Sequence, residues 1–243
     1  MIFQYLNIRT AIVLVISLLS CYLAIKFDFK IHFDVVVFGL AVAFPLGTSI
    51  QSAFKRRERA LEFLSAFKAG FTAIYYSLQS ERDLSPERKE EGRLLLIQAT
   101  DSIFKQLREA NGDNVQFQKT MDSIYQFMER NREFISGRIV IRIIRYLRDS
   151  MEASTFLLSL VRHRTMIGLR FYSLSFINVF AVIQAPMVVY ELENQLPMWA
   201  LYFTTGFSSL ILITLYNFQL LIEYPFDEKG ADDIDLNNFK LHI

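Results

Sequence analysis

Apolar positions gather in four stretches that contain no charged side chain. These stretches are residues 10–25, 35–54, 171–190 and 198–222. An α-helix rises about 1.5 Å per residue, so about 20 residues cross a hydrocarbon core of about 30 Å. The last three stretches reach this length, and the long side chains of Arg9 and Lys26 extend the shorter first stretch to the membrane interfaces. The pattern therefore predicts four transmembrane helices.

The segment between the second and third stretches, residues 55–165, is charged and carries apolar residues at helical spacing. The recurring positions are Leu96, Ile97, Ile103, Phe104, Leu107, Ile124, Phe127, Met128, Ile139, Ile143, Leu147 and Met151. This period predicts a bundle of amphipathic helices, with breaks at the turn-forming residues 83–86 and 111–114. No Gly/Ser-rich linker separates the bundle from the spans. We expect one all-α domain over residues 1–243, with helices that leave the membrane without stopping.

Basic residues near the ends of the four stretches lie mostly on one side. That side holds Arg9, Lys55, Arg56, Arg57, Arg59, Arg162, Arg164, Arg170 and Lys229, against Lys26 and Lys30 on the other. Because basic loops of membrane proteins remain in the cytoplasm, both termini and the segment 55–165 are predicted to be cytoplasmic. The protein is then a multi-pass protein of the cell inner membrane.

Composition agrees with a lipid environment and narrows the partners. Hydrophobic residues make up 52% of the chain and aromatic residues 14%, and the mean hydropathy is +0.26. A formal net charge of +1 argues against a nucleic-acid partner. The single cysteine, Cys21, excludes an intrachain disulfide. A signal peptide over the first stretch is the alternative reading, but the stretch offers a poor cleavage site and a second span follows closely.

The second span, residues 35–54, differs from a plain lipid anchor. It contains Gly39, Pro45 and Gly47, which weaken a helix and give it local flexibility, and polar residues in its later half. Leu40, Phe44 and Thr48 follow one another at four-residue spacing and so share one face. A ring of such faces would form a narrow apolar pore neck. Helix packing through small residues is an equally good interpretation of the spacing alone.

A row of arginines follows in the charged segment. Arg138, Arg142, Arg145 and Arg148 lie three or four residues apart, which places them along one helix face. The sequence favours a solvated or salt-bridged face, and the alternative is a basic lining that concentrates anions at the cytoplasmic mouth of a pore.

Two short motifs and the order of segments resemble the bestrophin family. The stretch 39–48 is similar to the bestrophin pore helix, and 222–236, with Pro225-Phe226 before an acidic cluster, is similar to the segment after its last span. Two spans, a cytoplasmic helical block, two spans and an acidic tail also follow the bestrophin layout. The resemblance implies a homopentamer around a central pore, with Leu40, Phe44 and Thr48 at the neck and small ions, mostly anions, as cargo.

The acidic tail, residues 223–243, raises the question of a metal site. Its carboxylates Asp227, Glu228, Asp232, Asp233 and Asp235 are oxygen ligands that suit Ca²⁺, and animal bestrophins bind calcium with such a cluster. The spacing does not match an EF-hand loop. The sequence favours a solvated acidic tail over a calcium site, and we expect no other cofactor.

The chain shows no catalytic constellation. His32, His163 and His242 are far apart, and no phosphate loop or nucleophile motif is present. We therefore expect an oligomeric ion channel for small ions such as chloride, not an enzyme, with the lipid bilayer, the ions and other copies of the chain as partners. A non-conducting scaffold whose bundle binds a cytoplasmic partner is the main alternative. An enzyme acting on lipid is a third hypothesis.

Overall fold

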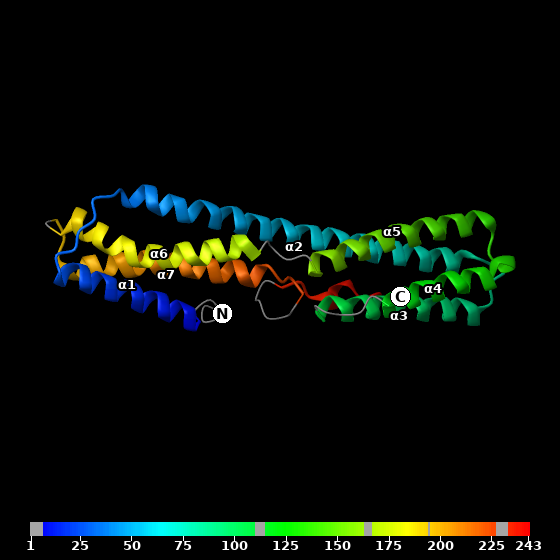
Figure 1. Cartoon of the computed structure of the whole chain (residues 1–243). Helices are drawn as coiled ribbons and strands as arrows, with labels where there is room; N and C mark the ends of the chain where they lie inside the picture. The colour runs from blue at the N-terminus through cyan, green and yellow to red at the C-terminus, as the bar shows by residue number, and fades with distance from the viewer. Residues whose placement is uncertain (1–6, 110–114, 163–166, 194, 227–232) are drawn as a thin grey trace. The chain divides into compact units, whose positions relative to one another are not determined.

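The computed structural model describes residues 7–109, 115–162, 167–193, 195–226 and 233–243, and within them it contains helices and no strand. The α-helices are α1 (Ile8–Lys26), α2 (Val35–Ser80), α3 (Pro86–Arg108), α4 (Val115–Arg130), α5 (Gly137–Arg162), α6 (Ile167–Leu192) and α7 (Met198–Ile222), and the short 3₁₀ helices are η2 (Arg132–Phe134) and η3 (Leu236–Phe239). The all-α prediction is confirmed (Figure 1). The contacts divide the chain into two compact units, of which the first comprises residues up to 55 and 165–223.

Four helices in the described residues are long and apolar enough to cross a membrane, and they contain the four predicted spans. α1 begins two residues before the apolar run, where the side chain of Asn7 accepts hydrogen bonds from the backbone N–H groups of Arg9 and Thr10 and so caps the helix. α2 continues for 46 residues, well beyond the apolar run that ends at Phe54. The expectation of a helix that continues without a break beyond its apolar run is therefore confirmed for α2.

The first unit packs α1, α6 and α7 against one another, and the first part of α2 adds its apolar face to the same core. Val42 and Leu46 of α2 are buried among Phe180 of α6 and Ile213 of α7. Phe38 of α2 stacks on Phe180 with ring centroids 5.8 Å apart. These contacts fix which face of α2 is turned toward its own unit.

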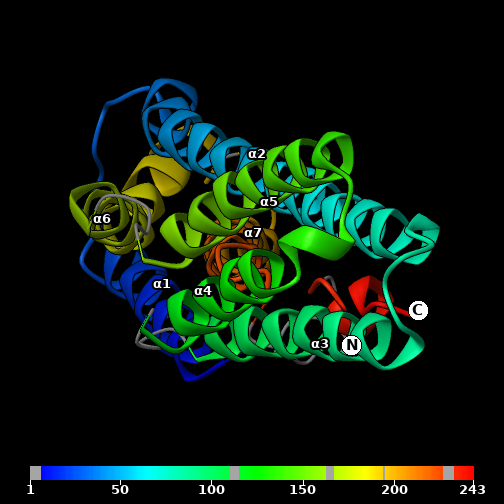
Figure 2. The same ribbon diagram turned by 90° about the vertical axis from the view of Figure 1, so that its right-hand side faces the viewer.

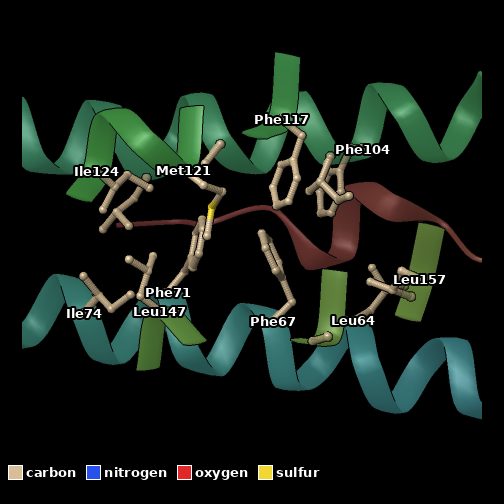
Figure 3. Close-up of a cluster of buried hydrophobic side chains, with 14 of the residues drawn as sticks. Leu64, Phe67, Phe71, Ile74, Phe104, Phe117, Met121, Ile124, Leu147 and Leu157 are labelled. Atoms are coloured by element: carbon tan, nitrogen blue, oxygen red, sulfur yellow. The ribbon is translucent and has the colours of Figure 1, made fainter. Parts of the chain in front are cut away.

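The second unit has a large aromatic and aliphatic core. The later turns of α2 form a bundle with α3, α4 and α5, which lie on one side of α2 in Figure 2, and Phe67, Phe71 and Phe104 are almost fully buried in this bundle. Figure 3 shows Phe67 and Phe71 from α2 directed toward Phe117 and Met121 from α4. α3 begins at Pro86 with Ser85 as its N-cap, so the turn predicted at 83–86 is confirmed.

Most of the periodic apolar positions belong to this core, and one of them is exposed. Ile103, Ile124 and Ile143 are buried as expected. Met151 is 43% exposed, so its assignment to the apolar stripe is wrong. The step from Ile139 to Met151 is four residues each time, which turns about 40° too far at every step, and the buried apolar positions of the last turns of α5 are Ala153, Leu157 and Leu158. The break predicted at 111–114 lies outside the described residues.

The C-terminal segment packs inside the second unit. Leu236 is fully buried, Lys68 of α2 donates to the carbonyl of Asn238 at 3.0 Å, and Arg93 of α3 donates to the backbone oxygen of Ile243 at 3.1 Å. In Figure 3 this segment runs between α2 and the green helices α3 and α4. Leu236 thus anchors the residues after 233 in the core, whereas the side chain of Asp235 is exposed, as expected for a solvated acidic tail.

Candidate functional site

One face of α2 in the first unit is left uncovered by the described part of the chain. Leu40 and Phe44 are 61% and 74% exposed, and Thr48, one turn further on, is exposed as well. Leu46 and Ser49, on the other side of the same turns, are buried. Large apolar side chains that remain outside a core mark a surface for lipid, for another protein or for another copy. We call Leu40, Phe44 and Thr48 the α2 face.

Of the three helix-weakening residues of α2, Gly47 lies on the open side of the helix and Gly39 on its packed side. Pro45 sits inside the helix and has no N–H group, so the carbonyl of Ala41 has no partner one turn later. The hydroxyl of Thr48 donates to the carbonyl of Pro45 at 2.9 Å, so it is bound to its own helix. A Cβ added at Gly47 would meet nothing within 4 Å, whereas one at Gly39 would touch Phe180 at 3.8 Å. Gly47 therefore belongs to the open side of α2, and Gly39 to its packed side.

A buried polar cluster joins α1, α6 and α7, and sequence analysis missed it. The amide nitrogen of Gln184 donates to the carbonyl of Thr205 and to the hydroxyl of Ser209, both at 2.6 Å. The hydroxyl of Ser209 donates to that of Ser17 at 2.9 Å, and Ser17 donates to the carbonyl of Thr205 at 3.1 Å. We call Ser17, Gln184, Thr205 and Ser209 the glutamine cluster. Its only sequence signal is a glutamine within an apolar span.

A second polar group lies where α6 begins and α7 ends. The carboxylate of Glu223 is fully buried, with the guanidinium Nε of Arg170 at 3.6 Å. Asn217 donates its amide to the hydroxyl of Thr10 at 2.9 Å. Arg170 was expected only as an interfacial basic residue. The structure gives it a carboxylate partner, as an ionised group that leaves water requires.

The arginine row on α5 is exposed along its whole length. Arg138, Arg142 and Arg145 are open to solvent, and the exposed side chains of Ile141 and Ile144 lie between them. Arg148 pairs with Asp149 at 2.8 Å, and this hydrogen bond raises the pKa of the guanidinium above its ordinary value. The four arginines share a face, as the spacing predicted, and one of them is already neutralised by its neighbour.

The structure brings few of the other predicted candidates together. Asp227, Glu228 and Asp232 lie outside the described residues. The carboxylate of Asp235 accepts the backbone N–H of Asn237 at 2.9 Å and so caps η3. Among the residues that the structure describes, no group of three or more His, Cys, Asp or Glu could hold a metal ion.

The fold is similar to solved membrane-protein structures, although the sequence matches no family model and no curated protein. Two crystal structures of a bacterial bestrophin homologue from Klebsiella pneumoniae, each with one substitution, have TM-scores of 0.82 and 0.83 at 15% and 14% identity. Both cover 95% of this chain, over 94% and 92% of their own. A crystal structure described as a membrane protein has a TM-score of 0.78 at 16% identity, over 98% of this chain and 93% of its own.

These similarities extend over nearly the whole chain. The class of fold is therefore that of an all-helical membrane protein with four spans and a helical bundle. Within that class the chain has the bestrophin-like fold, at an identity that makes it divergent in sequence.

Proposed function

We propose that the chain is one subunit of an oligomeric channel that conducts small ions, with anions such as chloride preferred. The observation that carries this proposal is the α2 face, where a leucine, a phenylalanine and a threonine at four-residue spacing remain exposed beside a helix whose other side is buried. The bestrophin-like fold supports it, because the resemblance implies a homopentamer with this helix around the central pore. No enzymatic step is assigned to the chain.

In this proposal the α2 faces of several copies form the neck. Leu40 and Phe44 make an apolar constriction, which conducts only when it is wetted. The edges of the Phe44 rings carry positive quadrupole potential and favour anions. Pro45 leaves the carbonyl of Ala41 available to the pore or to a neighbouring helix. The exposed arginines of α5 raise the local anion concentration at the cytoplasmic side.

The proposed location is the cell inner membrane, with several spans and with both termini in the cytoplasm. The excess of Lys and Arg on one side of the four spans supports this orientation. Bound calcium is not required by the proposal.

Flux through liposomes tests the proposal directly. The purified full chain is reconstituted, and chloride and sodium fluxes are measured for the native protein and for Phe44→Ala. Removing the largest neck side chain widens the constriction, so flux rises or the ratio of chloride to sodium changes. Phe203→Ala is the matched control, because Phe203 is an exposed phenylalanine of α7 stacked on Phe207, and its loss leaves conduction unchanged.

A non-conducting scaffold is the second candidate, and the exposed Ile141 and Ile144 among arginines on α5 favour it, since such a mixed face suits a protein partner. Under this function neither the native chain nor Phe44→Ala conducts in a preparation shown to be a folded oligomer. That outcome would exclude the channel.

A further inference from the structure

An apolar pocket opens at the end of α1, in the first unit. It has a volume of about 380 Å³ and lies between the last turns of α1, the chain that follows them, and the part of α6 around Pro186. Its walls include Phe27, Phe29 and Val182, and its one hydroxyl belongs to Ser20. This volume is within the usual range of ligand pockets, about 300–1,000 Å³. The part of a ligand that occupies this pocket must therefore be apolar.

The end of α1 is shaped to form one wall. Asp28 adopts φ 50°, and the N–H of Phe29 donates to the carbonyl of Ala24 at 2.9 Å while the N–H of Asp28 donates to that of Ile25 at 3.4 Å. This pair of bonds is a Schellman motif, which closes a helix and folds the next residue back against it. Phe29 is thereby placed over Ala24, and both residues line the pocket.

The opposite wall follows from Pro186 in α6. Because Pro186 has no N–H, the carbonyl of Val182 lacks its helical partner, and the hydroxyl of Ser20 donates to it at 2.6 Å. The only hydroxyl at the pocket is therefore engaged. Lys30 bridges Asp28 at 2.7 Å and Glu193 at 2.5 Å, so the loop that completes the pocket is held to the end of α6.

A cation stands at the edge of the pocket. The ammonium group of Lys26 lies 5.9 Å from the ring centroid of Phe27 and 5.5 Å from that of Tyr22. No carboxylate of the described residues is at ion-pair distance from it, whereas Lys30 has two. Aromatic rings and a lysine at the end of a span mark the level of the lipid headgroups. The site thus joins an apolar pocket in the span to a cation at the headgroup level.

We propose that this pocket binds one anionic phospholipid, with an acyl chain against Phe27, Phe29 and Val182 and with the phosphate at Lys26. An exposed lysine near the membrane surface contributes about 1 kcal/mol toward an anionic lipid, which is about a fivefold preference over a zwitterionic one. This preference for an anionic lipid is a property of the pocket and does not depend on whether the chain conducts ions.

Quenching by brominated lipids tests the site in the full chain. Trp199 is the only tryptophan, so Trp199→Phe combined with Phe27→Trp places a single fluorophore in the wall of the pocket. The protein is reconstituted in vesicles that contain brominated phosphatidylglycerol in unlabelled phosphatidylcholine, or brominated phosphatidylcholine in unlabelled phosphatidylglycerol. The reporter is expected to show about a fivefold preference for phosphatidylglycerol, and Lys26→Gln in the same background is expected to abolish it.

Two comparisons separate a built site from ordinary lipid contact. Trp199 in the otherwise native chain is 71% exposed at the start of α7 and should show no such preference. Val182→Phe fills the pocket and reduces quenching by either lipid, whereas Val179→Phe, on an exposed position of α6 outside the pocket walls, does not. Equal quenching by the two lipids would identify ordinary annular lipid, and absence of quenching would mean that protein, such as a second copy, covers the pocket. Either result would overturn the proposal.

Discussion

Replacing Gln184 by leucine should destabilise the first unit, because it removes the centre of the glutamine cluster. Gln184 is 1% exposed and makes two hydrogen bonds of 2.6 Å to α7. Interhelical hydrogen bonds in membranes contribute about 0.6 kcal/mol each on average and at most about 1.7 kcal/mol. Leucine keeps most of the volume, so the expected loss in the free energy of unfolding is about 1–3 kcal/mol.

Gln219 is a matched control of the same residue type. It is also 1% exposed, but neither its amide nitrogen nor its amide oxygen has a hydrogen-bond partner among the described residues. An unsatisfied buried amide costs about 1–3 kcal/mol, so Gln219→Leu is expected to leave stability unchanged or to raise it. Only the substitution of Gln184 is therefore expected to lower the free energy of unfolding.

Equilibrium unfolding in mixed micelles, followed by circular dichroism during titration with sodium dodecyl sulfate, gives both free energies. Combining Gln184→Leu with Ser209→Ala should cost less than the sum of the single changes, because the two residues share a hydrogen bond. If Gln184→Leu were as stable as the native chain, or if the two glutamines behaved alike, hydrogen bonding would not explain the packing of α6 on α7.

Two further predictions concern the second unit. A Cβ at Gly70 would lie 2.2 Å from the hydroxyl oxygen of the fully buried Ser150, so Gly70→Ala should lower the Tm, at a cost of about 1–3 kcal/mol, and adding Ser150→Ala should restore much of it. Arg93 donates two hydrogen bonds to Glu90 and holds the pKa of that carboxyl below its ordinary value of 4.5. This contribution is present above pH 4.5 and is lost as the pH falls through the lowered pKa, so the Tm of the native chain should fall more steeply below pH 4.5 than that of Glu90→Gln.

The spans and the amphipathic helices could be predicted because each depends on a local pattern. A transmembrane span can be recognised from the length and composition of a run without charged residues. Ile103 and Phe127 are buried because the helical period of apolar residues places them on the face that packs in the core. The continuous helix α2 could also be predicted, since no Gly or Pro follows Phe54 until Gly70. The exposure of Leu40 and Phe44 on a shared face agrees with their spacing, whereas their place in a pore stays a prediction.

Other features depend on contacts between distant segments and could not be predicted. Ser17, Gln184 and Ser209 meet only because three helices pack in one arrangement, and no spacing in the sequence encodes it. The burial of Leu236 could not be predicted either, because its partners are far away in the sequence and the acidic residues before it suggested a solvated tail. The proposed lipid pocket lies between the C-terminal end of α1 and the part of α6 around Pro186, and these two segments are far apart in the sequence.

The glutamine cluster also has a consequence for how the chain enters the membrane. During synthesis α6 emerges before α7, and at that moment the carbonyl of Thr205 and the hydroxyl of Ser209 do not yet exist as partners for Gln184. Ser17 on α1 is the one member of the cluster already present. A polar amide among lipid chains is unfavourable. The hydrogen bonds from Gln184 to α7 therefore stabilise α6 in the membrane only after α7 has been inserted. We therefore expect the two helices to integrate as a hairpin, and a chain that stops before Ser209 to insert α6 less completely.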